Sequence, residues 1–184
     1  MMISRPAANE HAPYYGTYIE AAAQALEAQG DDDLITLLAS QVSQLRALFT
    51  GLDAQIARTV YAPGKWTLGE SLIHMSDTER VFSYRLLRFA RGDQTPLAGF
   101  DQDPWVPCSR AQSRTLVDIL DELESVRGAT LALVRSLDAE AIAATGTASG
   151  VTVSARALAW MIAGHFAHHL GLTRDRYLAT ATDG

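Results

Sequence analysis

Apolar residues recur every three or four positions over four long stretches, and this periodicity restricts the fold of the chain more than any other feature. The first stretch follows three aspartates at 31–33, which supply a cap for a helix start, and its apolar positions are Leu34, Leu38, Val42, Leu45, Phe49, Leu52 and Ile56. Similar periodicity predicts helices over 67–91, 113–137 and 154–177, preceded by a short helix over 18–29. No convincing strand pattern appears, although 151–153 has a short extended character. The sequence therefore predicts an all-α protein, most simply a four-helix bundle.

Local signals mark where these helices begin and end. Thr67 and Glu70 have the spacing of a capping box, Gly92 suits a helix end, and Ser154 suits a helix start. The stretch 92–113 has no helical period and is rich in helix-breaking residues, which are Pro96, Gly99, Pro104 and Pro107. We expect a long irregular loop there, between the second and third long helices.

Length and charge exclude several classes of protein. A chain of 184 residues suits a single domain, with nearly half of its residues apolar, and is expected to be globular over 1–184. The formal net charge is −6 and no cluster of Lys or Arg stands out, so nucleic acid is not an expected partner.

Cysteine usage and the apolar runs predict a compartment. Cys108 is the single cysteine, so no internal disulfide forms, and the first ten residues lack the apolar stretch of a secretory signal. No apolar run approaches the length that crosses a bilayer. We expect a cytoplasmic protein without a membrane partner.

Two histidines share the apolar stripe of the last predicted helix. His165 and His169 fall with Leu158, Ile162 and Leu172 within an arc of about 80° on a helical wheel. Side chains four positions apart have Cβ atoms about 6 Å apart, so both imidazoles can reach one cation. His168 lies about 100° from His169, which predicts a place at the rim of a site or behind its ligands. His74, at the border of the apolar arc of the second long helix, is a candidate third ligand.

The histidines have two interpretations from spacing alone. They are either neutral core residues satisfied by hydrogen bonds, or ligands that share a cation, which satisfies two ring nitrogens at once. A site with three histidines resembles catalytic zinc sites, because structural zinc sites use four protein ligands. Zinc is expected first because it occupies such sites most often, and nickel, iron and manganese are also compatible with histidine ligands.

Acidic residues on the same helix as His74 are further candidates. Glu79 lies inside the apolar arc, where an ionised carboxylate is costly without a partner. It is either a general base or a group that orients a ligand, or it pairs with a buried arginine such as Arg46 or Arg85, which is the favoured interpretation. Asp77 projects about 60° from His74, which predicts a solvated residue or one behind the ligands.

Two tryptophans and the single cysteine are also candidates for a pocket or a reactive group. Trp66 precedes the helix of His74 and Trp105 lies in the long loop, and packing is the favoured role for both. Cys108, also in the loop, has no basic neighbour beyond Arg110, so we do not expect an activated thiol.

Several stretches of the chain resemble a known family. They are PGKWTLGESLIHMSDTER at 63–80, YRLLRFARGD at 84–93, FDQD at 100–103, and GHFAHHLG at 164–171 ahead of Arg176 and Tyr177. One histidine after the tryptophan-led turn and a His-x-x-x-His pair downstream resemble the DinB-like superfamily of helical bundles, over about 14–178.

The resemblance implies a fold and a site. The fold is an up-down-down-up four-helix bundle, often a homodimer, and the site holds a divalent metal through three histidines that map onto His74, His165 and His169. Related bundles include bacillithiol transferases and mycothiol-dependent isomerases, in which a low-molecular-weight thiol is activated near the metal. Family membership does not fix a reaction.

These implications lead to two alternative functions. The first is a metal-dependent thiol transferase or hydrolase that acts on a small-molecule substrate, since a divalent ion eases proton loss from a bound thiol or water. The second is a non-catalytic stress-related or ligand-binding module with a structural metal.

Overall fold

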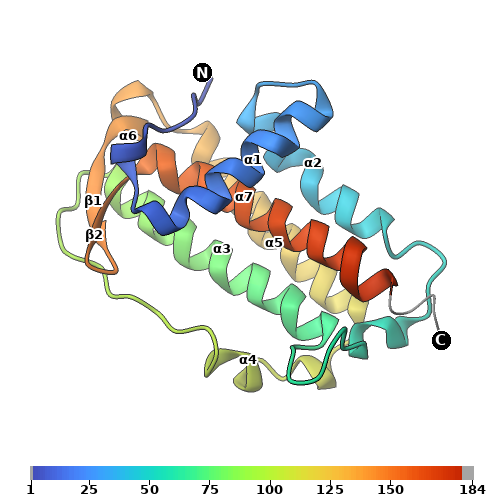
Figure 1. Ribbon diagram of the computed structural model, residues 1–184. Helices are drawn as coiled ribbons and strands as arrows, with labels where there is room; N and C mark the ends of the chain where they lie inside the picture. Colours follow the sequence, from blue (N-terminus) through green and yellow to red (C-terminus); the bar gives the residue numbers. More distant parts are fainter. Residues whose placement is uncertain (1, 180–184) are drawn as a thin grey trace.

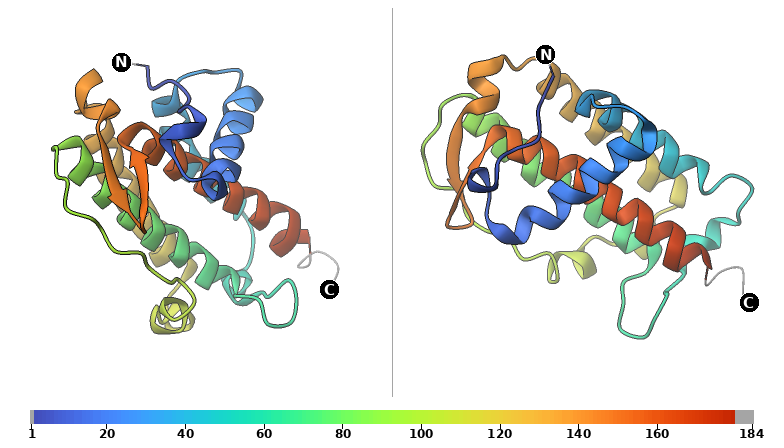
Figure 2. Two further views of the ribbon diagram at one scale, coloured as in Figure 1. Left: turned by 60° about the vertical axis from the view of Figure 1, so that its left-hand side comes forward. Right: turned by 45° about the horizontal axis from the view of Figure 1, so that its top comes forward.

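In the computed structural model, which describes residues 2–179, four long helices form a bundle (Figure 1). They are α2 (Leu34–Ala47), α3 (Leu68–Ala90), α5 (Leu116–Arg135) and α7 (Ala155–Leu172). Helices α2 and α7 run in one direction and α3 and α5 in the other (Figures 1 and 2), which is the up-down-down-up order. The all-α bundle predicted from the sequence is confirmed.

A fifth helix, α1 (Gly16–Gln29), lies across α7 in all three views (Figures 1 and 2). The crossing is so close that a Cβ atom at Gly164 would lie 1.7 Å from the carbonyl oxygen of Tyr18. Glycine in the middle of α7 is therefore required for α1 to pack there. The contact brings Tyr18 to the second half of α7, where the histidines are.

Side chains cap the starts of the long helices as the sequence predicted. The Glu70 amide donates to Thr67 Oγ1 at 3.2 Å, and the Thr67 amide donates to Glu70 Oε2 at 2.8 Å, which completes the capping box of α3. The Ala157 amide donates to Ser154 Oγ at 2.9 Å at the start of α7. These caps satisfy amides that have no partner within the helix.

Helix α2 is shorter than its apolar periodicity predicted. It ends at Ala47 and the chain turns at Gly51, which has a φ of +78°. The apolar spacing continues because the 3₁₀ helix η3 (Ala54–Arg58) returns Ile56 to the core, whereas Leu52 is 45% exposed. The prediction that this helix extends to residue 56 was therefore wrong. A turn followed by a 3₁₀ helix gives the same spacing of apolar residues along the sequence as one continuous helix.

A β-hairpin was missed by the sequence analysis. Strands β1 (Thr145–Ala148) and β2 (Val151–Ser154) pair antiparallel through a turn at Ser149 and Gly150. Both turn residues have positive φ, +53° and +76°, as a tight hairpin turn with the twist of the strands requires. The hairpin follows the short helix α6 (Ala139–Ala143). The extended character at 151–153 is confirmed, and the partner strand is the correction.

The last predicted helix changes type near its end. The α-helical hydrogen bonding of α7 stops at Leu172, and π-helical bonding follows over Thr173–Leu178, labelled η5. The predicted span of 154–177 is therefore helical, with a wider last turn.

The long connection between α3 and α5 contains two short helical turns, α4 (Trp105–Cys108) and η4 (Ala111–Ser113). It is fixed to the hairpin, because the Leu97 amide donates to Thr147 O at 2.9 Å and the Ser149 amide donates to Leu97 O at 3.0 Å. Figure 1 shows it running along the outside of α3. Two further 3₁₀ turns, η1 (Ala8–Glu10) and η2 (Pro13–Tyr15), precede α1.

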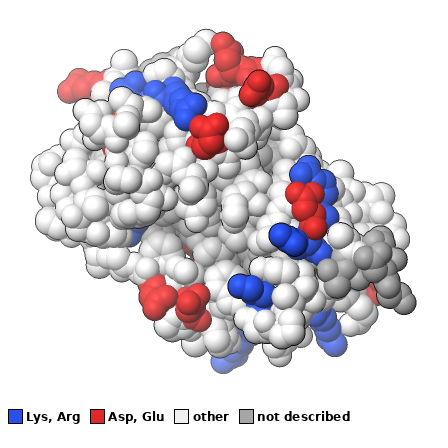
Figure 3. Space-filling model, viewed as in Figure 1, with Lys and Arg blue, Asp and Glu red and all other residues white. Residues whose placement is uncertain are grey.

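On the face shown in Figure 3, most of the surface is uncharged, and acidic and basic side chains are interspersed. Among residues 2–179, no helix combines the length and the apolarity needed to cross a bilayer.

Candidate metal centre

Three histidine side chains from two helices of the bundle converge. His74 comes from α3, and His165 and His169 come from α7, which runs antiparallel to it. Each offers one ring nitrogen, and these three atoms all lie within 4.8 Å of one another. The Nε2 atoms of His74 and His165 are 3.1 Å apart. The structure thus brings together the three histidines that the sequence analysis singled out.

Hydroxyl groups of α3 contact the far side of two imidazoles. Ser71 Oγ lies 3.2 Å from Nδ1 of His169, and Thr78 Oγ1 lies 3.4 Å from Nδ1 of His74. When Nδ1 donates to a hydroxyl, the ring is the tautomer whose Nε2 has a free lone pair. Ser71 and Thr78 therefore lie where they can accept from Nδ1 and leave Nε2 of both rings for a ligand.

Burial keeps the cluster uncharged. Loss of hydration lowers the pKa of His74 to about 4, against a smaller opposing effect of the Asp103 carboxylate. Loss of hydration, together with the neighbouring histidines, holds the pKa values of His165 and His169 well below their usual range. All three rings are neutral near pH 7, which is the form that binds a metal ion.

Aromatic side chains enclose the cluster. The Trp66 ring lies 4.9 Å from the His74 ring and the Tyr18 ring 5.2 Å from the His165 ring, measured between centroids. The Tyr177 hydroxyl donates a hydrogen bond of 2.9 Å to the backbone carbonyl of Trp66, which holds Trp66 in place. These rings pack against the sides of the site, and the cavity described next gives access to the histidines.

A cavity of about 310 Å³ opens beside the histidines, between α1, α3 and the long connection. His74 and His165 lie on its wall, so both imidazoles can be reached by a small molecule. Its other lining residues are aromatic or carry hydroxyl or amide groups, and they are Tyr14, Tyr15, Tyr18, Thr78, Phe82, Phe100, Gln102 and Ser149.

Glu79 has a buried arginine partner, as favoured from the sequence, but the partner is Arg127 of α5. Glu79 Oε1 and Oε2 accept hydrogen bonds from Arg127 Nε and Nη2, both at 2.8 Å. Arg127 Nη1 also donates to Gln41 Oε1 at 2.8 Å, and Gln41 Nε2 donates to Ala163 O at 2.7 Å. This network joins all four long helices, and its member on α7, Ala163, lies two residues before His165.

The two arginines expected beside Glu79 lie elsewhere. Arg46 is at the surface and pairs with Asp121 at 2.5 Å and Glu124 at 2.9 Å. Arg85 is buried and donates to Ala98 O and to Ser149 Oγ, both at 2.9 Å. Since both Glu79 oxygens are bound by Arg127, we assign the carboxylate to holding the bundle together and not to proton transfer.

Comparison with known proteins places the chain in a family. A family model described as the DinB superfamily matches residues 37–173, well over half of the sequence. The chain belongs to the DinB superfamily. The resemblance seen in the sequence is thus confirmed.

One solved structure shows the same fold as this DinB-superfamily chain. It is YfiT from Bacillus subtilis, described as a probable metal-dependent hydrolase with an unusual four-helix bundle topology. The two chains superpose with a TM-score of 0.69 over 77% of this chain and 85% of YfiT, at 18% sequence identity. No curated protein matches the sequence.

The remaining predicted residues of this DinB-superfamily chain lie outside the histidine cluster. Asp77 forms an ion pair of 3.4 Å with Arg80, and burial raises its pKa. His168 is exposed, with its ring 5.2 Å from that of His169, which is the rim position predicted from the helical wheel. Trp105 is 43% exposed and packs on Phe100 at 5.2 Å between ring centroids. Cys108 is exposed in α4.

Three site residues were missed by the sequence analysis. Ser71 and Thr78 lie three positions before and four after His74, so helical spacing alone indicated that they share its face. Tyr18 gave no such signal, because its contact with His165 depends on how α1 crosses α7.

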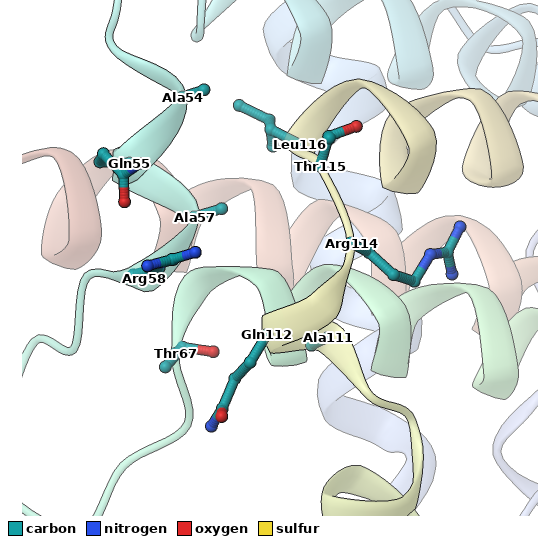
Figure 4. Close-up of a pocket in the computed structure, with 10 residues that line it drawn as sticks. All are labelled: Ala54, Gln55, Ala57, Arg58, Thr67, Ala111, Gln112, Arg114, Thr115 and Leu116. Carbon is teal, nitrogen blue, oxygen red and sulfur yellow. The ribbon is translucent and has the colours of Figure 1, made fainter.

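A separate groove of about 530 Å³ lies where α3 and α5 begin (Figure 4). Arg58 and Gln112 extend into it from η3 and η4, whereas Arg114 turns away, toward its partner Glu122. Its lining contains no histidine, so this groove is distinct from the candidate metal centre.

Proposed function

We propose that His74, His165 and His169 bind a divalent metal ion, and that the chain is a metal-dependent enzyme acting on a small molecule in the 310 Å³ cavity. The observation that carries the proposal is the convergence of three neutral imidazole nitrogens within 4.8 Å beside an accessible cavity. A hydrolase is supported by the fold shared with YfiT, and transfer of a low-molecular-weight thiol is the alternative that the sequence resemblance implies.

The donor set fits a catalytic ion. Packing alone favours apolar residues at these positions, whereas three uncharged imidazoles with oriented rings suit a cation. Three protein ligands is the number found in catalytic zinc sites, and nickel, iron and manganese also accept histidine nitrogens. We propose zinc as the first metal to test.

When bound, such an ion would lower the pKa of a water molecule or a thiol, which gives a nucleophile near pH 7. The residues of the chain supply orientation and shielding. Ser71 and Thr78 lie within hydrogen-bond distance of Nδ1 of His169 and His74 and would hold these rings in place, and Trp66 and Tyr18 cover the sides of the cluster. Polar side chains on the cavity wall, such as Gln102 and Ser149, are placed to hold a substrate by hydrogen bonds.

The test begins with metal content. We expect elemental analysis of the purified protein to show bound metal, and His165→Ala to abolish it. His168→Ala is the matched control, because it removes an exposed imidazole of the same helix. Equal metal content in the wild type and in His165→Ala would contradict the proposal.

Activity is then measured with metal-loaded protein. One panel contains small esters and amides, and a second contains electrophiles offered with bacillithiol, mycothiol, glutathione or coenzyme A. Turnover that is lost in His165→Ala identifies the reaction class. Metal binding without turnover in either panel would favour a structural metal in a non-catalytic module.

A further inference from the structure

Arg85 is a buried cation without an acidic partner. Its side chain is 2% exposed, and its Nη2 donates to two neutral acceptors, Ala98 O and Ser149 Oγ. Among the ion pairs within residues 2–179 none involves Arg85, and both of its side-chain hydrogen bonds come from Nη2. Arg127, equally buried, is paired with Glu79. A buried cation is costly unless it is paired, so Arg85 is prepared for an anion from outside the chain.

Arg85 borders a second cavity, of about 500 Å³, whose walls are mainly apolar. Leu97, Phe100 and Trp105 of the long connection form one side, and Val81 of α3 contributes to the other. The guanidinium carbon of Arg85 lies 5.7 Å from the centre of the Phe100 ring. The cavity therefore combines an apolar surface with one uncompensated positive charge.

The other charged groups on this cavity wall do not neutralise Arg85. Asp77 is paired with Arg80 at 3.4 Å, and Arg80 is also paired with Glu122 at 2.6 Å. Glu122 is also paired with Arg114, so these two arginines and two carboxylates balance one another.

The cavity at Arg85 adjoins the cavity at the histidines. Phe100 lines both, and Ser149, which accepts a hydrogen bond from Arg85, lines the histidine cavity. Ser149 holds this place with a left-handed backbone and an amide bonded to Leu97 O. Arg85 lies eleven residues after His74, on the same face of α3 and about 16 Å along its axis. Helical side chains lean toward the helix start, which is the direction of His74.

We propose that Arg85 binds the carboxylate of an elongated, mainly apolar substrate whose other end reaches the histidine cluster. The body of the substrate packs against Phe100 and Trp105. A carboxylate suits the site because one guanidinium in an apolar cavity balances a single negative charge. The proposal rests on the proposed function for the position of the reacting end, and it adds the class of substrate.

The test uses thiols as probes, because a thiol group binds a metal ion in the histidine cluster. ω-Mercaptoalkanoic acids of increasing chain length are compared with ω-mercaptoalkanols of the same lengths, on cobalt-loaded protein. The dissociation constant is read from the thiolate-to-cobalt absorption band. We expect acids to bind about tenfold more tightly than alcohols at an intermediate length, where the carboxylate reaches Arg85.

Variants assign this preference to one side chain. Arg85→Met abolishes the advantage of the acid and leaves the affinity for the alcohol unchanged. Arg88→Met is the matched control, because Arg88 lies on the same helix and is paired with Asp93. Equal binding of acid and alcohol at every length by the wild type, a result that needs no variant, overturns the proposal.

A second measurement separates this proposal from the metal site. In metal-free protein, octanoate is expected to shift the ¹⁵N resonance of Arg85 Nε saturably, whereas octanol is not. If neither class of thiol binds cobalt-loaded protein, the proposal of a metal centre is contradicted. The octanoate titration then tests the carboxylate site at Arg85 independently of the metal. An unchanged Arg85 resonance at saturating octanoate refutes the carboxylate site.

Discussion

The guanidinium of Arg127 binds both carboxylate oxygens of Glu79, and the two side chains are 3% and 4% exposed. The pair joins the parallel helices α3 and α5 in the centre of the bundle. Arg127 also donates to Leu38 O at 2.7 Å and lies over the Phe166 ring at 4.6 Å, so it contacts α2 and the residue next to His165. The histidine cluster is therefore supported by a buried polar network.

Arg127→Met is expected to lower the free energy of unfolding by about 3–5 kcal/mol, because it leaves the Glu79 carboxylate buried and unpaired. Urea denaturation followed by circular dichroism measures the change. The double variant Glu79→Leu with Arg127→Met is expected to lose less stability than Arg127→Met, because no buried charge remains. A double variant at least as unstable as Arg127→Met would show that the ion pair is not the source of the loss.

Gly164→Ala is expected to destabilise the protein by about 1–3 kcal/mol, because the added Cβ meets the Tyr18 carbonyl oxygen and forces α1 away from α7. Thermal unfolding measures the effect. Gly128→Ala is the matched control, since Gly128 lies within α5 with no atom within 4 Å of its added Cβ, and it is expected to stabilise the protein by about 1 kcal/mol. Similar losses in both variants would argue against a close crossing at Gly164.

The sequence predicted what depends on neighbours along one helix. The pair His165 and His169 was visible from spacing, and so was the need of Glu79 for a buried partner. The identity of that partner was not, because Arg127 is 48 positions away and meets Glu79 through the parallel packing of α3 and α5. The end of α2 and the hairpin were missed for a related reason, since both depend on turns at Gly51 and at Ser149–Gly150 that interrupt or follow a regular pattern.

Ser71→Ala is expected to weaken metal binding about 10–100-fold, because Ser71 Oγ fixes the ring of His169 and such partners tune a ligand. Competition with a chelator of known affinity measures the change. Ser83→Ala is the control, since Ser83 lies on the same helix and its hydroxyl bonds the carbonyl of Glu79 instead of a histidine. If Ser71→Ala bound metal with wild-type affinity, the hydroxyl would not have the orienting role assigned to it.

The metal-free protein is expected to lose stability as the pH falls below about 6.5. Burial lowers the pKa of His74 from 6.5 to about 4, and it lowers those of His165 and His169 in the same direction. Between these pH values the unfolded chain binds more protons than the folded chain, so the free energy of unfolding decreases with decreasing pH. Urea midpoints at about pH 7.5 and about pH 5 measure the difference, which His74→Gln is expected to reduce because a titrating group is gone. His168→Gln, at an exposed position, is the control. A midpoint that is unchanged or higher at the lower pH would mean that burial does not hold the three rings neutral.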